Sequence, residues 1–598
     1  MPTKAAYSPL PPWPRSDYCG ELRAADAGRE VALWGWVATR RDHGGLIFID
    51  LRDREGIIQL VFNPAHAPAA HEAAGGVRSE YYLAVKGKVV LRSEGTINNE
   101  LPTGEIEVVV ANAEILAASL PPPFPLGAGA ETAAEELRLK YRYLDLRRPE
   151  MQKNLRRRHQ ALRGVRAWLD SQGFIEIETP ILWRSTPEGA RDYLVPSRVN
   201  PGKFYALPQS PQLLKQLLMV SGFDRYYQIA RCFRDEDLRA NRQPEFSQVD
   251  IEMTGPRPDE IMSVAEGMMA SVYEYAAGIK LEPPFPRMPY EEAMERYGSD
   301  KPDLRFGLEI SNLTVAFAGT AFKVFADALA RGDSIYGIAL PGEHQLSRRE
   351  LDEMADALRT QKGLGLAWAK AAEGAWQGPI ARHVSDEERV RVAATAGLGP
   401  GDTLLMVAAR KDKARPVMGD LRLLLGNRFN LPDPAAMRFL WVVDFPLFEY
   451  SEEDKRLVSA HHPFTAPHPA DVGLLDSDPA SIRALAYDMV LNGQEMGGGS
   501  IRIHDAELQI AILRILGLSR EDALGKFNFL LEALTYGAPP HGGIAFGVDR
   551  IAMMVCGTDS LRDVMAFPKT QKAVDPMSGA PSEVDPRQLK ELSIKVVS

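Results

Sequence analysis

Cysteine is scarce in this chain of 598 residues, and the three present, Cys19, Cys232 and Cys556, lie far apart without a CxxC pair. This spacing argues against a disulfide framework and a cysteine zinc site, and favours a reducing compartment. No apolar run approaches the roughly 18 residues that a membrane helix needs. The first 16 residues also lack the apolar core of a signal peptide. We therefore expect a cytoplasmic protein without a membrane segment.

Basic residues are also in the minority, with 70 Lys and Arg against 80 Asp and Glu and a net charge of −10. This balance argues against a protein coated in nucleic acid, although it permits a local basic patch. The chain contains no GxxxxGK[ST] sequence, which excludes a P-loop. An apolar content of 45% and a charged content of 25% are those of a globular protein. The length allows three or four domains.

The first hundred residues read as short strands. Five β-rich or alternating segments follow one another: VALWGWVAT, GLIFIDLRD, IIQLVF, YYLAVKGKVVLR and EIEVVVANAEIL. They predict a small β-barrel over residues 17–120, with the OB-fold as the natural candidate, after an N-terminal tail of residues 1–16. The proline- and glycine-rich stretch SLPPPFPLGAGAETAAEE then predicts a hinge or linker within residues 121–150.

The rest of the chain indicates an α+β domain that a second domain interrupts. Apolar residues at helical spacing predict a helix over 154–172, and FIEIETPIL predicts a strand that ends near Pro180. The candidate chemistry lies in residues 151–305 and 431–570, whereas residues 306–430 are rich in Ala, Leu and Arg. We predict that 306–430 form an inserted domain and that 571–598 are a C-terminal surface extension.

The first chemically rich segment is FRDEDLRANRQPEFSQVDIEM, residues 233–253. Its end alternates, so that Asp250 and Glu252 share one face of a strand. With the preceding YYQIARCFR it predicts an antiparallel pair joined by a long charged loop. Arginine forks suit phosphate and carboxylate groups, which favours an anionic ligand over this sheet. The alternative is an ordinary sheet whose polar face meets solvent.

The second segment is AYDMVLNGQEMGGGSIRIH, residues 486–504. Asn-Gly at 492–493 predicts a two-residue hairpin that places Asp488 and Glu495 on one face. Two neighbouring carboxylates favour a Mg²⁺ ion that they share with substrate phosphates. Alternatively, one carboxylate meets solvent and the other pairs with an arginine. Glycines 497–499 would allow a ligand to approach the backbone.

The third segment is GAPPHGGIAFGVDRIAMM, residues 537–554, in which glycines crowd a short strand and Arg550 opens an apolar helix. An arginine there could hold a terminal phosphate, although the helix alone is typical of a core. His461 and His462 are adjacent and would point to opposite sides of a strand. We therefore expect one of them to line a pocket, rather than both to bind one ion.

Together with TPEGARDYLVPSR (186–198), ALPQSPQLLKQ (206–216), HHPFT (461–465) and GSDKPDLRFGLE (298–309), these segments resemble, in order, the motifs of class II aminoacyl-tRNA synthetases of the bacterial aspartyl type. The resemblance implies an OB-fold anticodon domain, a hinge, and a catalytic domain of antiparallel sheet flanked by helices. An inserted α+β domain would interrupt the latter. The helix over 154–172 and the strand after it would form a homodimer interface.

The resemblance also implies a reaction, in which ATP and L-aspartate give aspartyl-adenylate and the aspartyl group passes to tRNA. Catalysis would involve Arg234, Glu236 and Arg550. Aspartate would be bound by Glu188, Gln212, Lys215, Arg234, Asp250, His461 and Arg502. ATP would be bound by Arg234, Asp235, Glu236, Gln243, Glu495, Gly547, Val548, Asp549 and Arg550. Asp488 and Glu495 would hold Mg²⁺. A ligase for lysine would need an acidic pocket, which Lys215 and Arg502 contradict, and an asparagine ligase is the nearest rival.

The barrel would bind the anticodon of the tRNA. By resemblance, Phe48 would stack on a base, Gln59 would read a base edge and Arg41 would meet a phosphate or base. His43 and Gly95 resemble the residues of enzymes with relaxed specificity, which charge both tRNA-Asp and tRNA-Asn. The alternatives are neutral drift at both positions in a strict tRNA-Asp enzyme and, more remotely, a non-catalytic OB-fold protein that binds nucleic acid.

Overall fold

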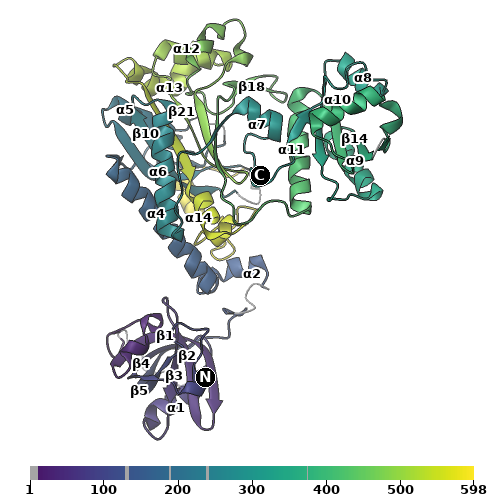
Figure 1. The fold of residues 1–598 in the computed structure, drawn as a ribbon. Helices are drawn as coiled ribbons and strands as arrows, with labels where there is room; N and C mark the ends of the chain where they lie inside the picture. Colours follow the sequence, from purple (N-terminus) through teal and green to yellow (C-terminus); the bar gives the residue numbers. More distant parts are fainter. Residues whose placement is uncertain (1–10, 128–132, 187–189, 237–241, 373–374, 598) are drawn as a thin grey trace. The chain divides into compact units, whose positions relative to one another are not determined.

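The computed structural model describes residues 11–127, 133–186, 190–236, 242–372 and 375–597. The chain divides into two compact units, which are residues 1–156 with 565–582, and residues 157–564 with 583–598. Figure 1 shows the elements of each unit, and each is considered by itself. No described helix combines the length and the apolar character needed to cross a membrane.

The first unit contains a closed barrel of five strands in the order β1-β2-β3-β5-β4, as the sequence predicted. Its strands and its helix are β1 (Glu30–His43), β2 (Leu46–Arg52), β3 (Ile57–Phe62), α1 (Pro68–Gly75), β4 (Tyr82–Leu91) and β5 (Ile106–Ala117). Only β3 and β5 pair in parallel. Along β2, Ile47 and Ile49 point into the barrel core, whereas the intervening Phe48 lies outside that core and is half-buried.

Two short helices follow the barrel within the predicted linker, α2 (Glu135–Lys140) and α3 (Arg142–Asp145). The buried Arg142 donates hydrogen bonds to the carbonyl oxygens of Met565 and Ala566, at 2.7 and 2.9 Å. A segment from the far end of the chain is thereby fastened to the connection that follows the barrel.

The second unit is built on an eight-stranded sheet of order β11-β17-β20-β21-β22-β10-β9-β6. The strands are β6 (Ile175–Glu176), β9 (Arg225–Phe233), β10 (Glu245–Thr254), β11 (Arg287–Pro289), β17 (Phe439–Val443), β20 (Ala486–Leu491), β21 (Gln494–Ile501) and β22 (His541–Gly547). The central pairs are antiparallel, and the short edge strands β6 and β11 pair in parallel. The strand predicted in FIEIETPIL is much shorter than expected, because β6 contains only Ile175 and Glu176.

Helices cover this sheet, and Figure 1 shows α4 and α6 lying together along it. The helices of this part of the chain are α4 (Pro149–Ser171), α5 (Gln212–Val220), α6 (Pro258–Ala277), α7 (Tyr290–Tyr297), α12 (Ala506–Ile515), α13 (Arg520–Leu534) and α14 (Val548–Cys556). Two hairpins, β7 (Leu194–Pro196) with β8 (Phe204–Ala206) and β18 (Phe448–Ser451) with β19 (Arg456–Ser459), accompany them, and α15 (Pro586–Glu591) follows near the C-terminus.

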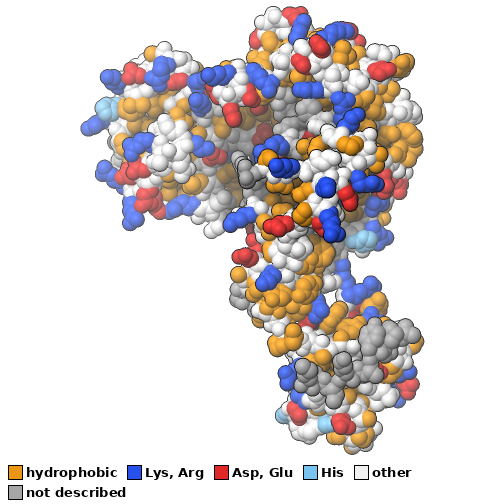
Figure 2. All heavy atoms as spheres, turned by 180° about the vertical axis from the view of Figure 1, so that it is seen from behind, with side chains coloured by type: hydrophobic (Ala, Val, Ile, Leu, Met, Phe, Trp, Pro, Cys, Tyr) orange, Lys and Arg blue, Asp and Glu red, His pale blue; other side chains and the backbone are white. Residues whose placement is uncertain are grey.

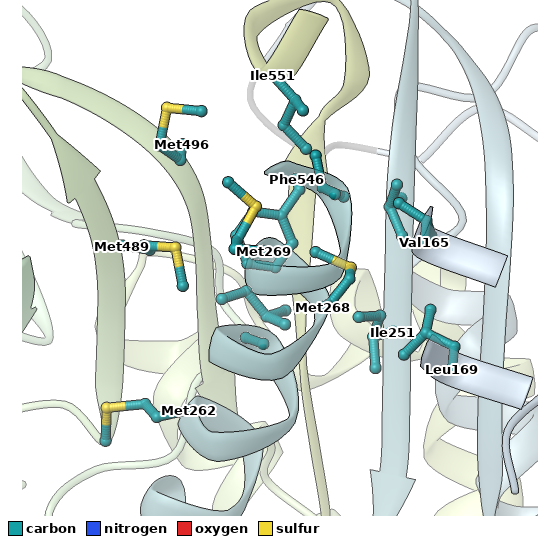
Figure 3. Packing of buried hydrophobic residues seen from close by; sticks show 14 of the residues in the cluster. Val165, Leu169, Ile251, Met262, Met268, Met269, Met489, Met496, Phe546 and Ile551 are labelled. Carbon is teal, nitrogen blue, oxygen red and sulfur yellow. The ribbon is translucent and has the colours of Figure 1, made fainter. Parts of the chain in front are cut away.

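Methionines dominate the centre of the core between α6 and the sheet. Met268 and Met269 of α6 lie close to Phe546 of β22 and Ile551 of α14 (Figure 3). Val165 and Leu169 of α4 belong to the same core, together with Ile251 of β10. Flexible thioether side chains fill irregular spaces between a helix and a sheet. The core therefore supports the strands from one face and leaves their other face available for chemistry.

The inserted domain has its own sheet of order β12-β13-β16-β14-β15. Its elements are β12 (Ile310–Asn312), α8 (Lys323–Ala330), β13 (Ser334–Leu340), α9 (Arg348–Lys362), β14 (Leu366–Ala372), β15 (Ala375–Gln377), α10 (Asp386–Ala396), β16 (Thr403–Ala409) and α11 (Lys411–Arg428). Lys and Arg side chains are spread over the visible face of this domain, on the left in Figure 2.

One arginine closes the inserted domain at its base. Arg422 of α11 is 1% exposed and donates to the carbonyl oxygens of Asp303, Phe306 and Gly307 at 2.8–2.9 Å. Its guanidinium also lies 4.0 Å from the centre of the Phe306 ring. The segment that enters the domain is thus bound to the helix that leaves it.

Candidate active site

The polar face of the central sheet forms a cavity of about 490 Å³. Side chains from β10, β21, β22, α5, α14 and the segment around residue 461 line it. Most of the predicted site residues meet here: Gln212, Lys215, Arg234, Glu236, Gln243, Asp250, His461, Asp488, Glu495, Arg502, Gly547, Asp549 and Arg550. Glu188 lies outside the described residues.

The predicted alternation of β10 is present, but neither of its faces meets solvent. Val249 and Ile251 enter the apolar core, while Asp250 and Glu252, on the opposite face, are 1% and 0% exposed. The ordinary solvent-facing sheet considered above is therefore wrong. Because buried carboxylates are costly without partners, the cations around them define the site.

Two cations and two anions form a buried network at the floor of the cavity. Lys215 Nζ of α5 lies 3.1 Å from Asp250 Oδ1 and 3.6 Å from Glu252 Oε2. Arg502 binds Glu252 with both arms, from Nε to Oε1 at 3.0 Å and from Nη2 to Oε2 at 3.1 Å. Glu252 was not predicted as a site residue. Its position two residues after Asp250, on the same face of the strand, was the signal that could have found it.

The surroundings shift the pKa values of the two buried carboxylates of β10, Asp250 and Glu252, in opposite directions. Burial raises the pKa of Asp250, and Lys215 only partly offsets this effect. Burial also opposes ionisation of Glu252, but Arg502 and Lys215 together hold its pKa below the usual value. Asp250 Oδ2 and Gln212 Nε2 are buried and have no hydrogen-bond partner among the described residues. One acceptor and one donor at this cavity thus remain unsatisfied for a bound ligand.

Both histidines of the HHPFT motif line the cavity, which corrects the expectation that only one would. The reason is that His461 and His462 lie in an irregular segment after β19 rather than in a strand. Burial lowers the pKa of His461 to about 4 and that of His462 well below its usual value, and the Arg502 charge contributes to both shifts. His462 Nε2 lies 2.6 Å from Arg502 Nη1. His461 Nε2 is buried without a partner in the described part of the chain.

The hairpin β20–β21 has the predicted register, with Val490 opposite Glu495 and a turn at 492–493 with φ of 51° and 80°. An irregularity after Met489 places Asp488 opposite Gly498. A Cβ atom on Gly498 would lie 2.6 Å from Asp488 Oδ1 and 3.8 Å from Glu495 Oε1. The carboxylates of Asp488 and Glu495 therefore both lie beside the backbone of Gly498, which has no side chain to separate them.

This pair of carboxylates fits a divalent cation. Asp488 Oδ1 is buried without a hydrogen-bond partner among the described residues. Burial and the neighbouring Glu495 raise the pKa of Asp488 well above its usual value. Within the described residues no group of three or more His, Cys, Asp or Glu is placed to hold a metal ion alone. A Mg²⁺ ion here would need further oxygen ligands, such as phosphates.

The remaining predicted residues differ in how directly they face the cavity. Arg234 lies with its guanidinium 5.1 Å from the centre of the Phe246 ring, and Glu236 pairs with Arg242 at 2.7 Å. Arg550 Nη1 donates to the Glu495 carbonyl and lies 3.9 Å from Glu495 Oε2, so the predicted alternative of a carboxylate near an arginine is partly realised.

Three residues of the predicted ATP set, Asp549, Val548 and Asp235, make contacts with other parts of the protein. Asp549 is 4% exposed, accepts a hydrogen bond from the Ser247 backbone at 3.1 Å and pairs with Arg158, which ties α14 to β10. Val548 is buried in the apolar core. The Asp235 carboxylate lies 3.9 Å from Arg191 Nε, and neither Val548 nor Asp235 lines the cavity.

The predicted anticodon residues share the outer surface of the barrel. Arg41 pairs with Phe48 across β1 and β2, and Asp50 pairs with Gln59 across β2 and β3. Arg41 Nη2 lies 2.9 Å from Asp50 Oδ1 and donates to Gln59 Oε1 at 3.3 Å. The exposed Arg41 and the half-buried Phe48 and Gln59 thus form one ladder of polar groups with an aromatic ring beside it.

The two candidate discrimination residues are also at the barrel surface. His43 is exposed and ends β1, directly before the Gly44-Gly45 turn. Gly95 is exposed, and a Cβ atom added to it would have no heavy atom within 4 Å. Nothing in the described structure therefore requires glycine at position 95.

Residues 134–571 match the family described as tRNA synthetases class II (D, K and N), and residues 31–116 match the OB-fold nucleic acid binding domain. An aspartate–tRNA(Asp/Asn) ligase from Caldanaerobacter subterraneus subsp. tengcongensis is 53% identical over 97% of this chain and 98% of that protein. A protein of the same name from Moorella thermoacetica is 54% identical over 97% of this chain and 96% of its own length.

Solved structures share the fold at lower identity. Asparaginyl-tRNA synthetase from Pyrococcus horikoshii, complexed with asparaginyl-adenylate, matches 93% of this chain and 98% of its own with a TM-score of 0.59 and 22% identity. Aspartyl-tRNA synthetase from Entamoeba histolytica matches 93% and 91% with a TM-score of 0.57 and 17% identity. The predicted α+β architecture, with an OB-fold barrel and an interrupted catalytic domain, is confirmed. The chain belongs to the class II tRNA synthetases of the D, K and N group.

Proposed function

We propose that this protein is an aspartate–tRNA ligase that joins L-aspartate to tRNA-Asp and tRNA-Asn. The observation that carries the proposal is the pair of buried cations, Lys215 and Arg502, at the floor of the cavity. Glu252 and Asp250 hold them in place but leave polar atoms of the site unsatisfied. The relatives named aspartate–tRNA(Asp/Asn) ligase support the same substrate and the same pair of tRNAs.

The two ends of aspartate would meet opposite charges. Its side-chain carboxylate would bind Lys215 and Arg502, with His461 Nε2 as a further polar contact. Its ammonium group would bind Asp250 and the side-chain oxygen of Gln212, in the pocket where Glu188 is also expected. Because the substrate ammonium would share Asp250 with Lys215, the side-chain carboxylate of aspartate would restore the charge balance of the buried network. Neutral asparagine brings the ammonium without that carboxylate, which disfavours it because unbalanced buried charge is costly.

Adenylation would occur above this floor. The α-carboxylate of aspartate attacks the α-phosphorus of ATP, the bond to the bridging oxygen breaks, and pyrophosphate leaves. Arg234 would contact both the α-phosphate and the carboxylate, while Glu236 and Gln243 bind the rest of ATP and Arg550 the γ-phosphate. Asp488 and Glu495 would hold Mg²⁺, which when bound offsets the charge of the phosphates. The protein contributes chiefly positioning and charge stabilisation.

The aspartyl group would then pass from the adenylate to the terminal ribose of tRNA, with the release of AMP. Recognition of the anticodon would fall to Arg41, Phe48 and Gln59 on the barrel. His43 and Gly95 would permit both tRNAs. A homodimer would form through α4 and the extended segment after it, where Ile175, Ile181 and Leu182 are about half exposed and need cover.

The test has two stages. The first is ATP–pyrophosphate exchange with aspartate, asparagine or glutamate, and the expected result is exchange with aspartate alone. Exchange that is independent of aspartate would overturn the proposal. The second is aminoacylation of tRNA-Asp and tRNA-Asn transcripts side by side. Charging of tRNA-Asn below about a hundredth of that of tRNA-Asp, a gap of near 3 kcal/mol, would instead indicate a strict enzyme.

A further inference from the structure

The inserted domain contains a second hollow of about 890 Å³, lined only by residues of that domain. It lies where the sheet loses its edge strand. β14 runs over Leu366–Ala372, but β15 pairs only with Lys370–Ala372. The start of α9, the loop after β15 and the start of α10 form the remaining walls. We call this hollow the insertion groove.

The charges of the insertion groove have one sign. Arg348, Lys370, Arg382 and Arg389 line it, and none of the described lining residues is acidic. Arg348 and Arg382 are exposed, and Lys370 donates to Gln345 at 2.5 Å. Arg389 pairs with Asp386 outside the groove at 2.8 Å and donates to the Ala381 carbonyl, but its Nε is buried and has no partner among the described residues. Arg348 lies 4.0 Å from Asp352, which does not line the groove. Although the chain carries a net charge of −10, the local charge of this groove favours an anion.

Two half-buried tryptophans also line the groove, Trp368 on β14 and Trp376 on β15. Trp376 pairs with Ala371, whereas Trp368 shares a face with Lys370, so the two indoles leave opposite faces of the sheet at its edge. Gly378 has a φ of 117° and passes so close to Trp368 that a Cβ atom there would lie 2.7 Å from the ring. The backbone therefore holds Trp368 from one side. An indole offers a flat surface on which any nucleobase can stack.

Cations along a groove at a sheet edge, with an indole on each face of that edge, suit a nucleic acid strand whose bases are unpaired. Arginine forks bind phosphates, and tryptophan contacts the base. An acidic peptide would satisfy the cations but would not use the two indoles in the same way. We propose that the insertion groove binds an unpaired segment of the tRNA substrate, which rests on the proposed function.

The test compares two double variants of the full-length enzyme. Arg348→Glu with Arg382→Glu reverses two exposed charges in the groove. Arg331→Glu with Arg359→Glu makes the same change on the same domain, at exposed arginines that do not line the groove. The measurements are KM for tRNA in aminoacylation at several salt concentrations, and aspartate-dependent pyrophosphate exchange, which needs no tRNA.

The groove variant should raise KM for tRNA about tenfold and flatten its salt dependence by about one to two phosphate contacts. The control variant should change KM less than about twofold, and pyrophosphate exchange should persist in both. Equal KM values for the two variants, with exchange intact, would overturn the groove proposal alone. Loss of aspartate-dependent exchange in the unmodified enzyme would overturn the proposed function instead.

A direct probe separates RNA from other occupants of the groove. tRNA that carries 4-thiouridine, irradiated on the unmodified enzyme, should form adducts at Trp376 or Lys370 that mass spectrometry can locate. Adducts confined to the barrel and the catalytic domain would contradict the proposal and favour a protein partner for the groove.

Discussion

Arg502 and Glu252 form a two-armed ion pair at the floor of the candidate active site, with both side chains almost fully buried. Lys215 lies 3.6 Å from the same carboxylate. The pair therefore sets the position of both cations that would receive the aspartate side chain. Glu252 itself does not line the cavity, so it acts on the substrate only through Arg502 and Lys215.

The first prediction concerns this positioning residue. Glu252→Gln keeps the shape but leaves Arg502 without its anion and Lys215 with Asp250 as its remaining partner. We expect kcat/KM for aspartate in pyrophosphate exchange to fall about 100-fold, near 3 kcal/mol, because half of a buried ion pair is lost. The control is Glu507→Gln, whose carboxylate pairs with Arg520 at the surface. A drop in thermal stability with unchanged KM for aspartate would show a structural role only.

The second prediction concerns the floor between the two carboxylates. In Gly498→Ala the new methyl group would lie 2.6 Å from Asp488 Oδ1 and would push this side chain aside. The Mg²⁺ concentration for half-maximal pyrophosphate exchange should rise about tenfold, which corresponds to near 1.4 kcal/mol. Gly525→Ala, in α13 with no heavy atom within 4 Å of the added carbon, is the control. An unchanged Mg²⁺ requirement would place the ion elsewhere.

The third prediction is a dependence of stability on pH. The folded-state pKa of His461 is about 4, below the unfolded value near 6.5, so the unfolded chain takes up the proton first. Stability from this residue is present above pH 6.5 and is lost as the pH falls towards 4. Between pH 7 and pH 5 the loss should be about 2 kcal/mol.

Urea unfolding at both pH values checks this dependence. His461→Gln should flatten the change in unfolding free energy between them, whereas the exposed His504→Gln should not. If both variants retain the full slope, the imidazole of His461 is not held neutral by its surroundings.

The fourth prediction concerns anticodon binding. Phe48→Ala removes a ring outside the barrel core, so the fold should survive. Stacking of one base is worth about 1–3 kcal/mol, and KM for tRNA should rise by roughly 5- to 100-fold. Pyrophosphate exchange should not change. Leu91→Ala, at a side chain that is 60% exposed on the same barrel, is the control. An equal rise in KM for tRNA in Phe48→Ala and Leu91→Ala would contradict the stacking role of Phe48.

The fifth prediction concerns the choice of tRNA. His43→Leu with Gly95→Lys should weaken charging of tRNA-Asn selectively, while charging of tRNA-Asp stays within about twofold. Both positions are exposed, and the space around Gly95 accepts a side chain, so misfolding is not the expected cause. Parallel aminoacylation of the two transcripts is the measurement. A similar loss with both tRNAs would contradict the selective role.

Sequence patterns predicted what depends on local periodicity. Alternation located the barrel strands, and the Asn-Gly turn fixed the register that opposes Val490 and Glu495. Phe48 shows the limit of such patterns. A phenylalanine in a small barrel is usually core, and a stacking role was expected for it only from the resemblance. In the structure Ile47 and Ile49 enter the core and Phe48 lies outside it.

What the sequence could not give depends on contacts between distant segments. Glu252 was missed because its partners, Lys215 and Arg502, lie on other elements. The three glycines of β21 were treated alike, yet a Cβ atom on Gly497 or Gly499 would strike the β22 backbone, at 2.5 and 2.3 Å. Of these three glycines, only Gly498 would direct a Cβ atom towards the carboxylates of Asp488 and Glu495. Tertiary packing thus separates residues that are identical in the sequence pattern.

Arg422, which joins the entering and leaving segments of the inserted domain, has a consequence for evolution and engineering. One buried guanidinium holds both ends of the inserted domain together. For the catalytic sheet, the insertion of more than a hundred residues is therefore equivalent to a short loop whose ends lie close together. The cost of closing a loop grows only slowly with its length, and here the closure is made at the base. The domain can therefore gain, lose or exchange its outer surface while the geometry of the active site remains unchanged.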